Sequence, residues 1–219
     1  MGKKVGKHHA SLNQETIPPL LLIPQATKYE GAEMIGRGAH SEVYKVRVNL
    51  EGQIRDVVLK IFSTQWKEEF EAEVNAYERL LHGNIYGVVA EALGCDRGWD
   101  NPKLLDVLKC GIPPWSNLRT PVSALMLEYI EDAVPVSSVN VDYEICKEAM
   151  RGINLIHSVR VLHHDVGEEN ILLTPSGRIV WIDFSNSLPD PSDSELIEEK
   201  WIAHSLLWMT LVRFFVGMV

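Results

Sequence analysis

The sequence predicts an α+β protein in which an antiparallel sheet with one helix comes first and a mostly helical part follows. Two alternating apolar stretches at 43–48 and 56–62 are separated by a turn at Glu51-Gly52, which is typical of neighbouring strands. An amphipathic helix pattern follows at 65–82. Further along, a short hairpin pattern at 171–182 comes after a second helix pattern.

The composition is that of an ordinary soluble globular protein. The 219 residues suffice for one domain with a sizeable core or for two small lobes, with 46% apolar and 23% charged residues. The net charge of −9 argues against a general binder of nucleic acid or anionic membranes. The three cysteines are scattered and odd in number, which predicts no disulfide framework and favours an intracellular, cytoplasmic location.

The first 28 residues are expected to form an extended arm on the domain surface. Their apolar run at 17–24 is short and broken by prolines, unlike a signal peptide or a membrane span. We therefore expect no membrane span in this segment.

A turn with two glycines comes between the first two predicted strands. Gly36 and Gly38 follow a weakly alternating stretch at 32–35, and a clean strand begins at Val43. Glycines in such a turn let backbone N–H groups approach phosphate oxygens, because no Cβ intervenes. A plain hairpin turn is the alternative interpretation.

Lys60 is unusual because it lies inside an apolar strand. Burying an unpaired ammonium group is costly. Lys60 therefore either points to solvent from the polar face of the strand or pairs with a carboxylate and with phosphates.

The helix pattern that follows predicts Thr64 as the N-cap and an end at Gly83. Glu73 lies next to the apolar face, whereas Glu71 and Glu78 are expected in solvent. The predicted apolar stripe consists of Phe70, Val74, Tyr77 and Leu81.

The middle of the chain carries weaker patterns. A strand is expected at 88–95, followed by loop-like sequence, and a buried strand at 123–130. The next helix is expected at 141–158 and should support the loop that follows it. Its predicted core stripe consists of Tyr143, Cys146, Met150, Ile153 and Ile156.

One stretch in the second half holds two acidic residues and an amide at fixed separations. Apolar runs at 171–173 and 179–182 flank a Pro-Ser-Gly turn, which predicts a hairpin. Because a hairpin brings its ends side by side, Asn170 at its entry and Asp183 at its exit should lie close together. Two such oxygen ligands suit a Mg²⁺ ion that bridges phosphates. Asp165, on the preceding loop, is then placed to accept a proton from an attacking hydroxyl.

The segment 163–170, followed by Asp183-Phe184-Ser185, resembles the catalytic loop and the metal-binding Asp-Phe-Gly motif of the protein kinase superfamily. Upstream, a glycine turn, a strand lysine and a helix glutamate occur in the order of that family. The resemblance implies a bilobal protein-kinase-like fold, of the short, divergent kind found in fungi. Its parts would be an N-terminal arm (1–28), an N-lobe (29–128) and a reduced, mostly helical C-lobe (129–219).

The resemblance also implies the chemistry, which is phosphoryl transfer from ATP to a hydroxyl of a protein or small-molecule acceptor. Asp165 would be the catalytic base, Glu73 would hold Lys60, and Asn170 with Asp183 would bind Mg²⁺. Leu127 would be the gatekeeper, beside backbone groups that hydrogen-bond adenine. The ATP-binding residues implied in this way are Gly36, Arg37, Gly38, Ser41, Val43, Lys60, Leu127, Glu128 and Ile130.

Departures from the family pattern keep alternatives open. His164 replaces an arginine that reads a phosphorylated activation loop, and Gly167 replaces a lysine that touches the transferred phosphate. Small-molecule kinases of the aminoglycoside and choline type also lack that lysine. Ser185 replaces a glycine and is expected to restrict Asp183, and His163 is expected to pack beneath the loop rather than bind a metal. The alternatives are a small-molecule kinase and a nucleotide-binding, pseudokinase-like interaction module.

The end of the sequence predicts one more helix from about residue 194, with acidic first turns. The stretch 201–219 is strongly apolar, although His204 and Arg213 interrupt it. A buried closing helix is favoured over a membrane-associated segment or a truncated product with exposed core surface.

Overall fold

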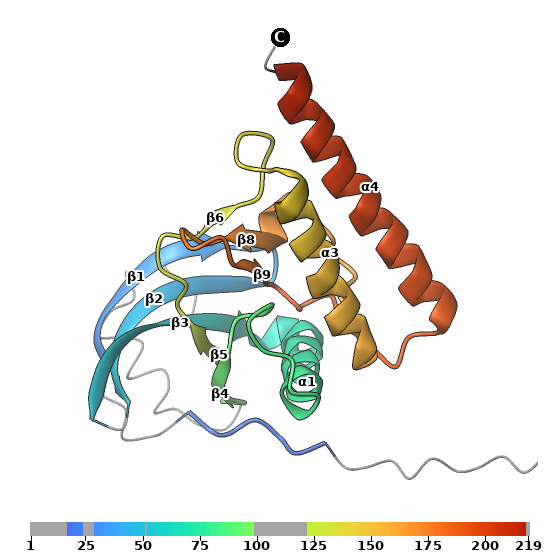
Figure 1. Ribbon diagram of the computed structural model, residues 1–219. Coiled ribbons are helices and arrows are strands. Elements are labelled where there is room, and N and C mark those ends of the chain that lie inside the picture. Colours follow the sequence, from blue (N-terminus) through green and yellow to red (C-terminus); the bar gives the residue numbers. More distant parts are fainter. Residues whose placement is uncertain (1–16, 24–28, 51, 99–121, 218–219) are drawn as a thin grey trace, which may run out of the picture.

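The computed structural model of the chain describes residues 17–23, 29–50, 52–98 and 122–217. In this part of the chain, five strands form one antiparallel sheet in the order β1-β2-β3-β5-β4 (Figure 1), which confirms the predicted sheet. The strands are β1 (Tyr29–Arg37), β2 (Ser41–Leu50), β3 (Gln53–Ser63), β4 (Ala92–Asp96) and β5 (Val122–Glu128). The strand expected at 88–95 therefore begins four residues later.

Side-chain alternation along β3 gives the sheet two different faces. Leu59 and Ile61 join an apolar cluster with Tyr44 on one face. Phe62 packs on the other face against Phe70, which belongs to the helix at 67–82 called α1. Lys60 shares that second face, so its side chain is directed toward α1 rather than into solvent.

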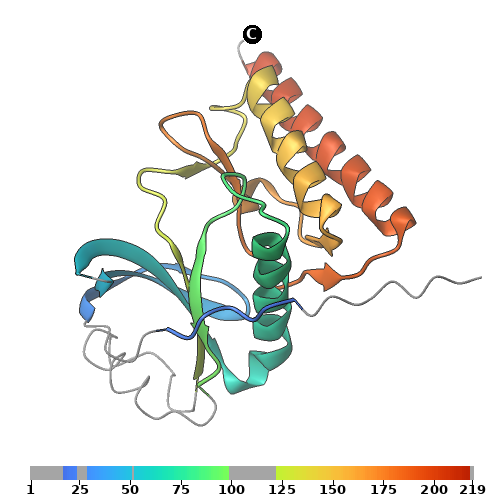
Figure 2. The ribbon, with the colours of Figure 1, turned by 60° about the horizontal axis from the view of Figure 1, so that its bottom comes forward.

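Helix α1 (Lys67–His82) lies beside the sheet (Figure 2) and ends at Gly83, as predicted. The predicted N-cap is wrong, because Thr64 belongs to a short 3₁₀ turn, η1 (Thr64–Trp66), that precedes the helix. The predicted apolar stripe of this helix is wrong at its last position, since Leu80 is buried and Leu81 is 39% exposed. The 3.6-residue repeat of the helix carries position 81 past the edge of the contact.

The second half of the described chain begins with small strands around a loop. The predicted hairpin is confirmed, with Ile171 opposite Trp181 and Leu173 opposite Ile179. Its strands β8 and β9 form a small sheet with β6, and β7 pairs with β10. These elements are β6 (Val134–Pro135), β7 (Val161–Leu162), η2 (Glu168–Asn170), β8 (Ile171–Leu173), β9 (Ile179–Trp181) and β10 (Leu188–Pro189).

Two antiparallel helices, α3 (Tyr143–Ser158) and α4 (Asp193–Gly217), complete the second half. Helix α3 begins where the Oδ1 atom of Asp142 accepts a hydrogen bond from the Ile145 N–H at 2.8 Å. Tyr143, predicted in the core, is 66% exposed because it stands in the first turn, before the stripe reaches the hairpin.

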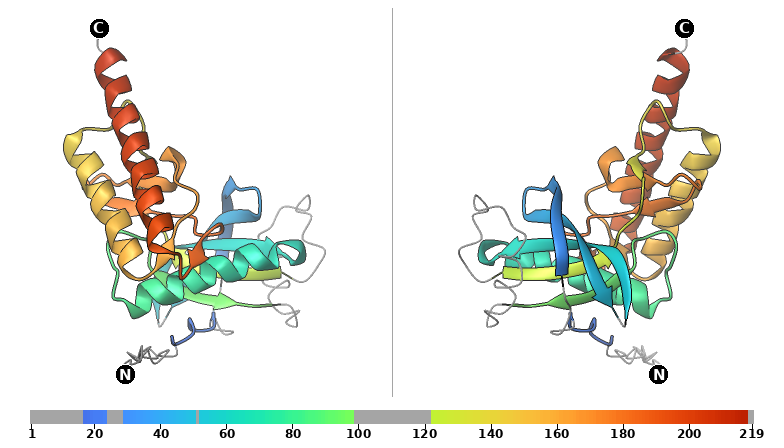
Figure 3. Two further views of the ribbon diagram at one scale, coloured as in Figure 1. Left: turned by 90° about the vertical axis from the view of Figure 1, so that its right-hand side faces the viewer. Right: turned by 90° about the vertical axis from the view of Figure 1, so that its left-hand side faces the viewer.

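Helix α4 is buried on one face only, so the prediction of a buried closing helix is wrong for its other face. Ala203, Leu207 and Leu211 are buried, whereas Trp201 and Trp208 are exposed. Figure 3 shows that α4 runs along α3. Among the described helices, none is both long and apolar enough to cross a membrane.

Polar contacts tie α1 to the segment that leads into α4. The Arg79 guanidinium donates to both carboxylate oxygens of Asp190, at 2.8 and 2.6 Å. About two turns earlier in α1, the carbonyl oxygen of Ala72 accepts a 3.0 Å hydrogen bond from the Ser187 hydroxyl. Helix α1 is therefore held along its length by the second half of the chain.

The described part of the predicted arm, residues 17–23, is extended and lies against β4 (Figure 2). Leu22 forms a parallel bridge with Cys95, and Leu20 and Ile23 are buried. The Leu20 N–H also donates to Glu78 of α1 at 2.9 Å. This segment covers the free edge of β4.

The packing of α3 against Trp181 of the β8–β9 hairpin can be tested at Gly152. A Cβ at this position would lie 2.7 Å from Nε1 of Trp181, a buried ring that donates to the Ala149 carbonyl. We expect Gly152→Ala to lower the free energy of unfolding by about 1 to 3 kcal/mol, because the overpacked ring has no room to move. Gly31→Ala is the control, since no atom lies within 4 Å of a Cβ there. Urea unfolding curves with equal midpoints for the two variants would contradict this packing.

Candidate active site

The Lys60 ammonium group joins three segments that are far apart in the sequence. Its Nζ atom lies 2.6 Å from Oε2 of Glu73 on α1 and 2.7 Å from Oδ1 of Asp183, which follows β9. Lys60 is only 4% exposed and Glu73 is fully buried. Charges that are buried this deeply persist only when they are paired, so these contacts fix α1 and the end of the hairpin against β3.

The ionisation states follow from this pairing. Burial acts to lower the pKa of Lys60, but Glu73 and Asp183 outweigh it and raise the pKa above its ordinary value. Burial acts to raise the pKa of Asp183, but the Lys60 charge and hydrogen bonds from Lys60 and Ser185 lower it to about 2. At neutral pH the site therefore holds an ammonium group beside an ionised Asp183.

Asp183 is held in an uncommon backbone conformation, with φ of 64°. Its Oδ1 atom accepts a 2.6 Å hydrogen bond from the hydroxyl of Ser185 and a 3.3 Å one from the Ser185 N–H. These contacts agree with the expectation that Ser185 restricts this carboxylate.

The hairpin brings the predicted metal ligands and the predicted base into one region. The Ile182 N–H donates to the Asn170 carbonyl at 3.0 Å, so the segments that carry Asn170 and Asp183 are adjacent. The side chain of Asn170 donates to the Asp165 carbonyl at 2.9 Å. The Asp165 carboxylate accepts a longer, 3.3 Å hydrogen bond from Asn186.

His163 packs beneath this loop, as expected. It is fully buried against the rings of Trp181 and Phe184, and its Nε2 atom lies 2.9 Å from the Ile182 carbonyl oxygen. Burial lowers the pKa of His163 below its ordinary value, so the ring is neutral at pH 7. The buried ring, held at one nitrogen, orients the loop.

Glu199 of α4 anchors the same loop, and the sequence reasoning missed it. Its carboxylate accepts hydrogen bonds from the His163 N–H at 2.9 Å and the His164 N–H at 2.5 Å, and it lies 2.6 Å from Nε2 of His157. The sequence pattern places Glu199 only in the acidic start of a helix. The available signal was its position four residues before Ala203, on the buried stripe of α4.

A cavity of about 470 Å³ lies between the sheet and the hairpin. Its lining includes eight of the predicted site residues, which are Gly36, Val43, Lys60, Glu73, Leu127, Glu128, Ile130 and Asp183. Arg37, Gly38 and Ser41 instead line a separate recess near Trp66. The Arg37 guanidinium lies 2.6 Å from the Glu42 carboxylate and does not line the cavity that contains Lys60.

Glu128 is engaged at the edge of this cavity. Its N–H donates to the Glu91 carbonyl at 2.8 Å, and its carboxylate accepts from Arg178 at 2.8 Å. A ligand at this edge therefore meets a strand end that is already fixed from both sides.

Curated relatives of the chain include serine/threonine protein kinases, while no family model matches it. Serine/threonine-protein kinase 1 of Arabidopsis thaliana is 25% identical over 83% of the chain, and serine/threonine-protein kinase mig-15 of Caenorhabditis elegans is 26% identical over 73%. Human kinase suppressor of Ras 2 is 26% identical over 71%. The chain spans only 14 to 20% of the length of these three proteins.

Fold and relatives agree with each other. The antiparallel sheet with its helix, followed by a more helical part, is the protein-kinase-like α+β fold, and the matches cover most of the chain. Together they support membership of the protein kinase superfamily.

The Glu199 anchor predicts a pH-dependent stability difference. Burial acts to raise the pKa of Glu199, but hydrogen bonds from His157 and from the backbone of His164 and His163 lower it. A lowered pKa in the folded state adds stability above the ordinary pKa, and this stability is lost as the pH falls through the lowered value. Glu199→Gln should therefore cost about 2 to 3 kcal/mol at pH 7, because its amide presents a donor to backbone N–H groups.

The difference in the free energy of unfolding between Glu199→Gln and the wild type should decrease as the pH is lowered. Urea unfolding at several pH values measures it. Glu198→Gln is the matched control, because the neighbouring Glu198 is exposed and should change little. Equal effects of the two substitutions would rule out the anchor.

Proposed function

We propose that this chain, whose fold and relatives are those of the protein kinase superfamily, is an ATP-dependent phosphotransferase that acts on a hydroxyl, with protein serine or threonine as the first candidate. The single observation that carries the proposal is the buried contact of Lys60 with both Glu73 and Asp183. A purely structural protein has no need of a buried ammonium group that faces a cavity, because an apolar side chain would be no less stable there.

The cavity fits a nucleotide in size and in the distribution of its lining. About 470 Å³ lies within the range of small-molecule sites. Val43, Leu127 and Leu172 supply apolar surface for a base, and Lys60 supplies the positive charge for phosphates. Gly36 lets the backbone come close to a ligand from the sheet side.

Asn170 and Asp183 are the residues that would hold Mg²⁺, which supplies charge neutralisation on the phosphates when bound. The donor set fits, because an amide oxygen and an ionised carboxylate are hard oxygen ligands. A pKa of about 2 keeps Asp183 ionised at any physiological pH. Ser185 orients the carboxylate by its 2.6 Å hydrogen bond.

Asp165 is proposed to accept the proton of the acceptor hydroxyl. Asn170 fixes its backbone and Asn186 orients its carboxylate. The proton would move from the hydroxyl oxygen to a carboxylate oxygen of Asp165 as that hydroxyl attacks phosphorus. The chain itself contributes mainly positioning to this reaction.

Gly167 supports a small-molecule kinase as the second candidate. A Cβ at this position would lie 2.6 to 2.8 Å from the carboxylate of Glu169, so a lysine there would displace that side chain. The cation that protein kinases place beside the transferred phosphate is thus replaced by an open backbone next to an acidic residue. The third candidate, a nucleotide-binding interaction module, predicts binding without turnover. The division into an arm (1–28), an N-lobe (29–128) and a C-lobe (129–219) remains part of this proposal.

Mg²⁺-dependent ATP binding is the first expected property. ATP at a hundredfold excess over its dissociation constant should raise the free energy of unfolding by about 2.7 kcal/mol when Mg²⁺ is present. A thermal-shift assay measures this stabilisation. Asp183→Asn should remove the shift, because the carboxylate that would bind the metal is lost. Asp193→Asn, on the exposed start of α4, is the control that should keep it. No shift in the wild type would exclude the nucleotide site.

Asp165→Asn separates catalysis from binding. The variant should keep the ATP-dependent thermal shift and lose at least about 10²-fold in turnover, because only the proton acceptor changes. Radiolabelled phosphate transfer to protein and to amino-alcohol acceptors gives the rate and distinguishes the first two candidates. Binding without turnover in the wild type would favour the interaction module.

A further inference from the structure

Helix α4 carries apolar side chains on two opposite faces. One face packs on α3 through residues such as Ala203 and Leu207. At about 100° per residue, the exposed apolar residues fall within one arc of about 140° on the other side. These residues, here called the outer face, are Ile197, Trp201, Ile202, Trp208, Met209, Val212 and Val216.

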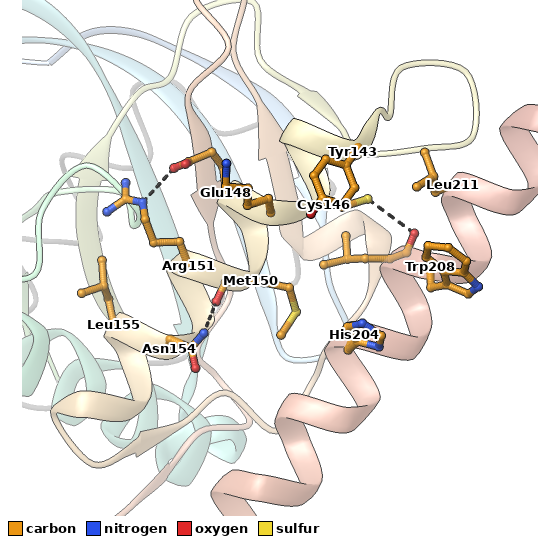
Figure 4. Close-up of a pocket in the computed structure, with 12 residues that line it drawn as sticks. Tyr143, Cys146, Glu148, Met150, Arg151, Asn154, Leu155, His204, Trp208 and Leu211 are labelled. Carbon is orange, nitrogen blue, oxygen red and sulfur yellow. Dashed lines mark hydrogen bonds and ion pairs between the residues drawn. The ribbon is translucent and has the colours of Figure 1, made fainter.

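The outer face continues into a groove between α3 and α4 (Figure 4). The groove has a volume of about 610 Å³, and Trp208 lines it together with His204 from α4. Tyr143 and Met150 line it from α3. The apolar surface is therefore continuous from the outer face to the flank of α3.

The area of the outer face matches that of a protein interface. Its seven side chains are between 38 and 69% exposed. With side-chain areas of about 150 to 250 Å², these fractions correspond to roughly 700 Å² per chain. A stable interface takes about 800 Å² from each partner, and a helix that is apolar all round is normally buried.

We propose that the outer face binds a second copy of this chain, with the two α4 helices antiparallel about a two-fold axis close to Ser205. The face extends from Ile197 to Val216, and Ser205 lies near the middle of both its length and its arc. Ser205 is exposed and small, so it allows two helices to approach closely at the crossing point. A two-fold axis uses the same patch on both copies, so one apolar face is sufficient.

Charge favours the antiparallel arrangement. The first turns of α4 are acidic, with Asp193, Glu195 and Glu198, whereas Arg213 is near its other end. Arg213 lies 3.7 Å from Glu168 and is still 64% exposed on its side chain. Antiparallel helices place Arg213 of one copy opposite the acidic turn of the second copy, and parallel helices would place two acidic ends together.

Sedimentation equilibrium of the full chain tests this interface without reference to catalysis. We expect a wild-type dimer that Trp201→Glu and Ile202→Glu convert to monomers, since each buries a charge in the interface. Ile54→Glu near the start of β3 is the matched control, because Ile54 is 59% exposed and Ile202 is 50% exposed. This control should remain dimeric, and circular dichroism should show all variants folded.

A wild-type chain that stays monomeric would overturn the proposal, and binding to phosphatidylcholine vesicles would then assign the outer face to a lipid surface. The orientation has its own test. Ser205→Cys should form an interchain disulfide under mild oxidation, because the two copies of this position meet near the axis. Val212→Cys on the same face should not, because antiparallel helices place its two copies about 21 Å apart, whereas parallel helices would bring them together. Equal cross-linking of the two variants would reject the antiparallel arrangement.

Discussion

The buried ammonium group of Lys60 is the constraint on which the rest of this structure depends. A strand, a helix and the exit of a hairpin each supply one member of the contact, and none of these elements is close to the others in the sequence. An unpaired charge at this depth would be far more costly than any single apolar contact is favourable. The relative positions of β3, α1 and Asp183 are therefore set by electrostatics within a core that is otherwise apolar.

Glu199 provides hydrogen-bond acceptors for the backbone of the loop that begins at His163. Backbone N–H groups at His163 and His164 lie where no strand or helix can pair them, and a carboxylate from α4 accepts both. The same carboxylate contacts His157 of α3. Helix α4 thus contributes to the candidate site through one acidic residue on its inner face, while its outer face is available for another role.

Local sequence patterns, such as the alternation of apolar residues and the position of turn residues, were sufficient to predict much of the fold. Alternation placed β2 and β3, the turn residues placed the β8–β9 hairpin, and Gly83 marked the end of α1. The pairing of Lys60 with Glu73 was predicted from the order of the motifs rather than from any one pattern, whereas the contact of Lys60 with Asp183 was not predicted. Tertiary contacts decided the remainder: Glu199 is recognisable only when its backbone partners are known, and the exposure of Leu81 depends on where α1 meets its neighbours.

The contacts of Arg79 with Asp190 and of Ser187 with Ala72 have a mechanical consequence. They attach α1 to the segment just after Asp183, so the helix that carries Glu73 cannot rotate as a rigid body while that segment stays still. Movement of α1 away from the sheet would therefore either break these contacts or displace the segment after Asp183 together with the helix.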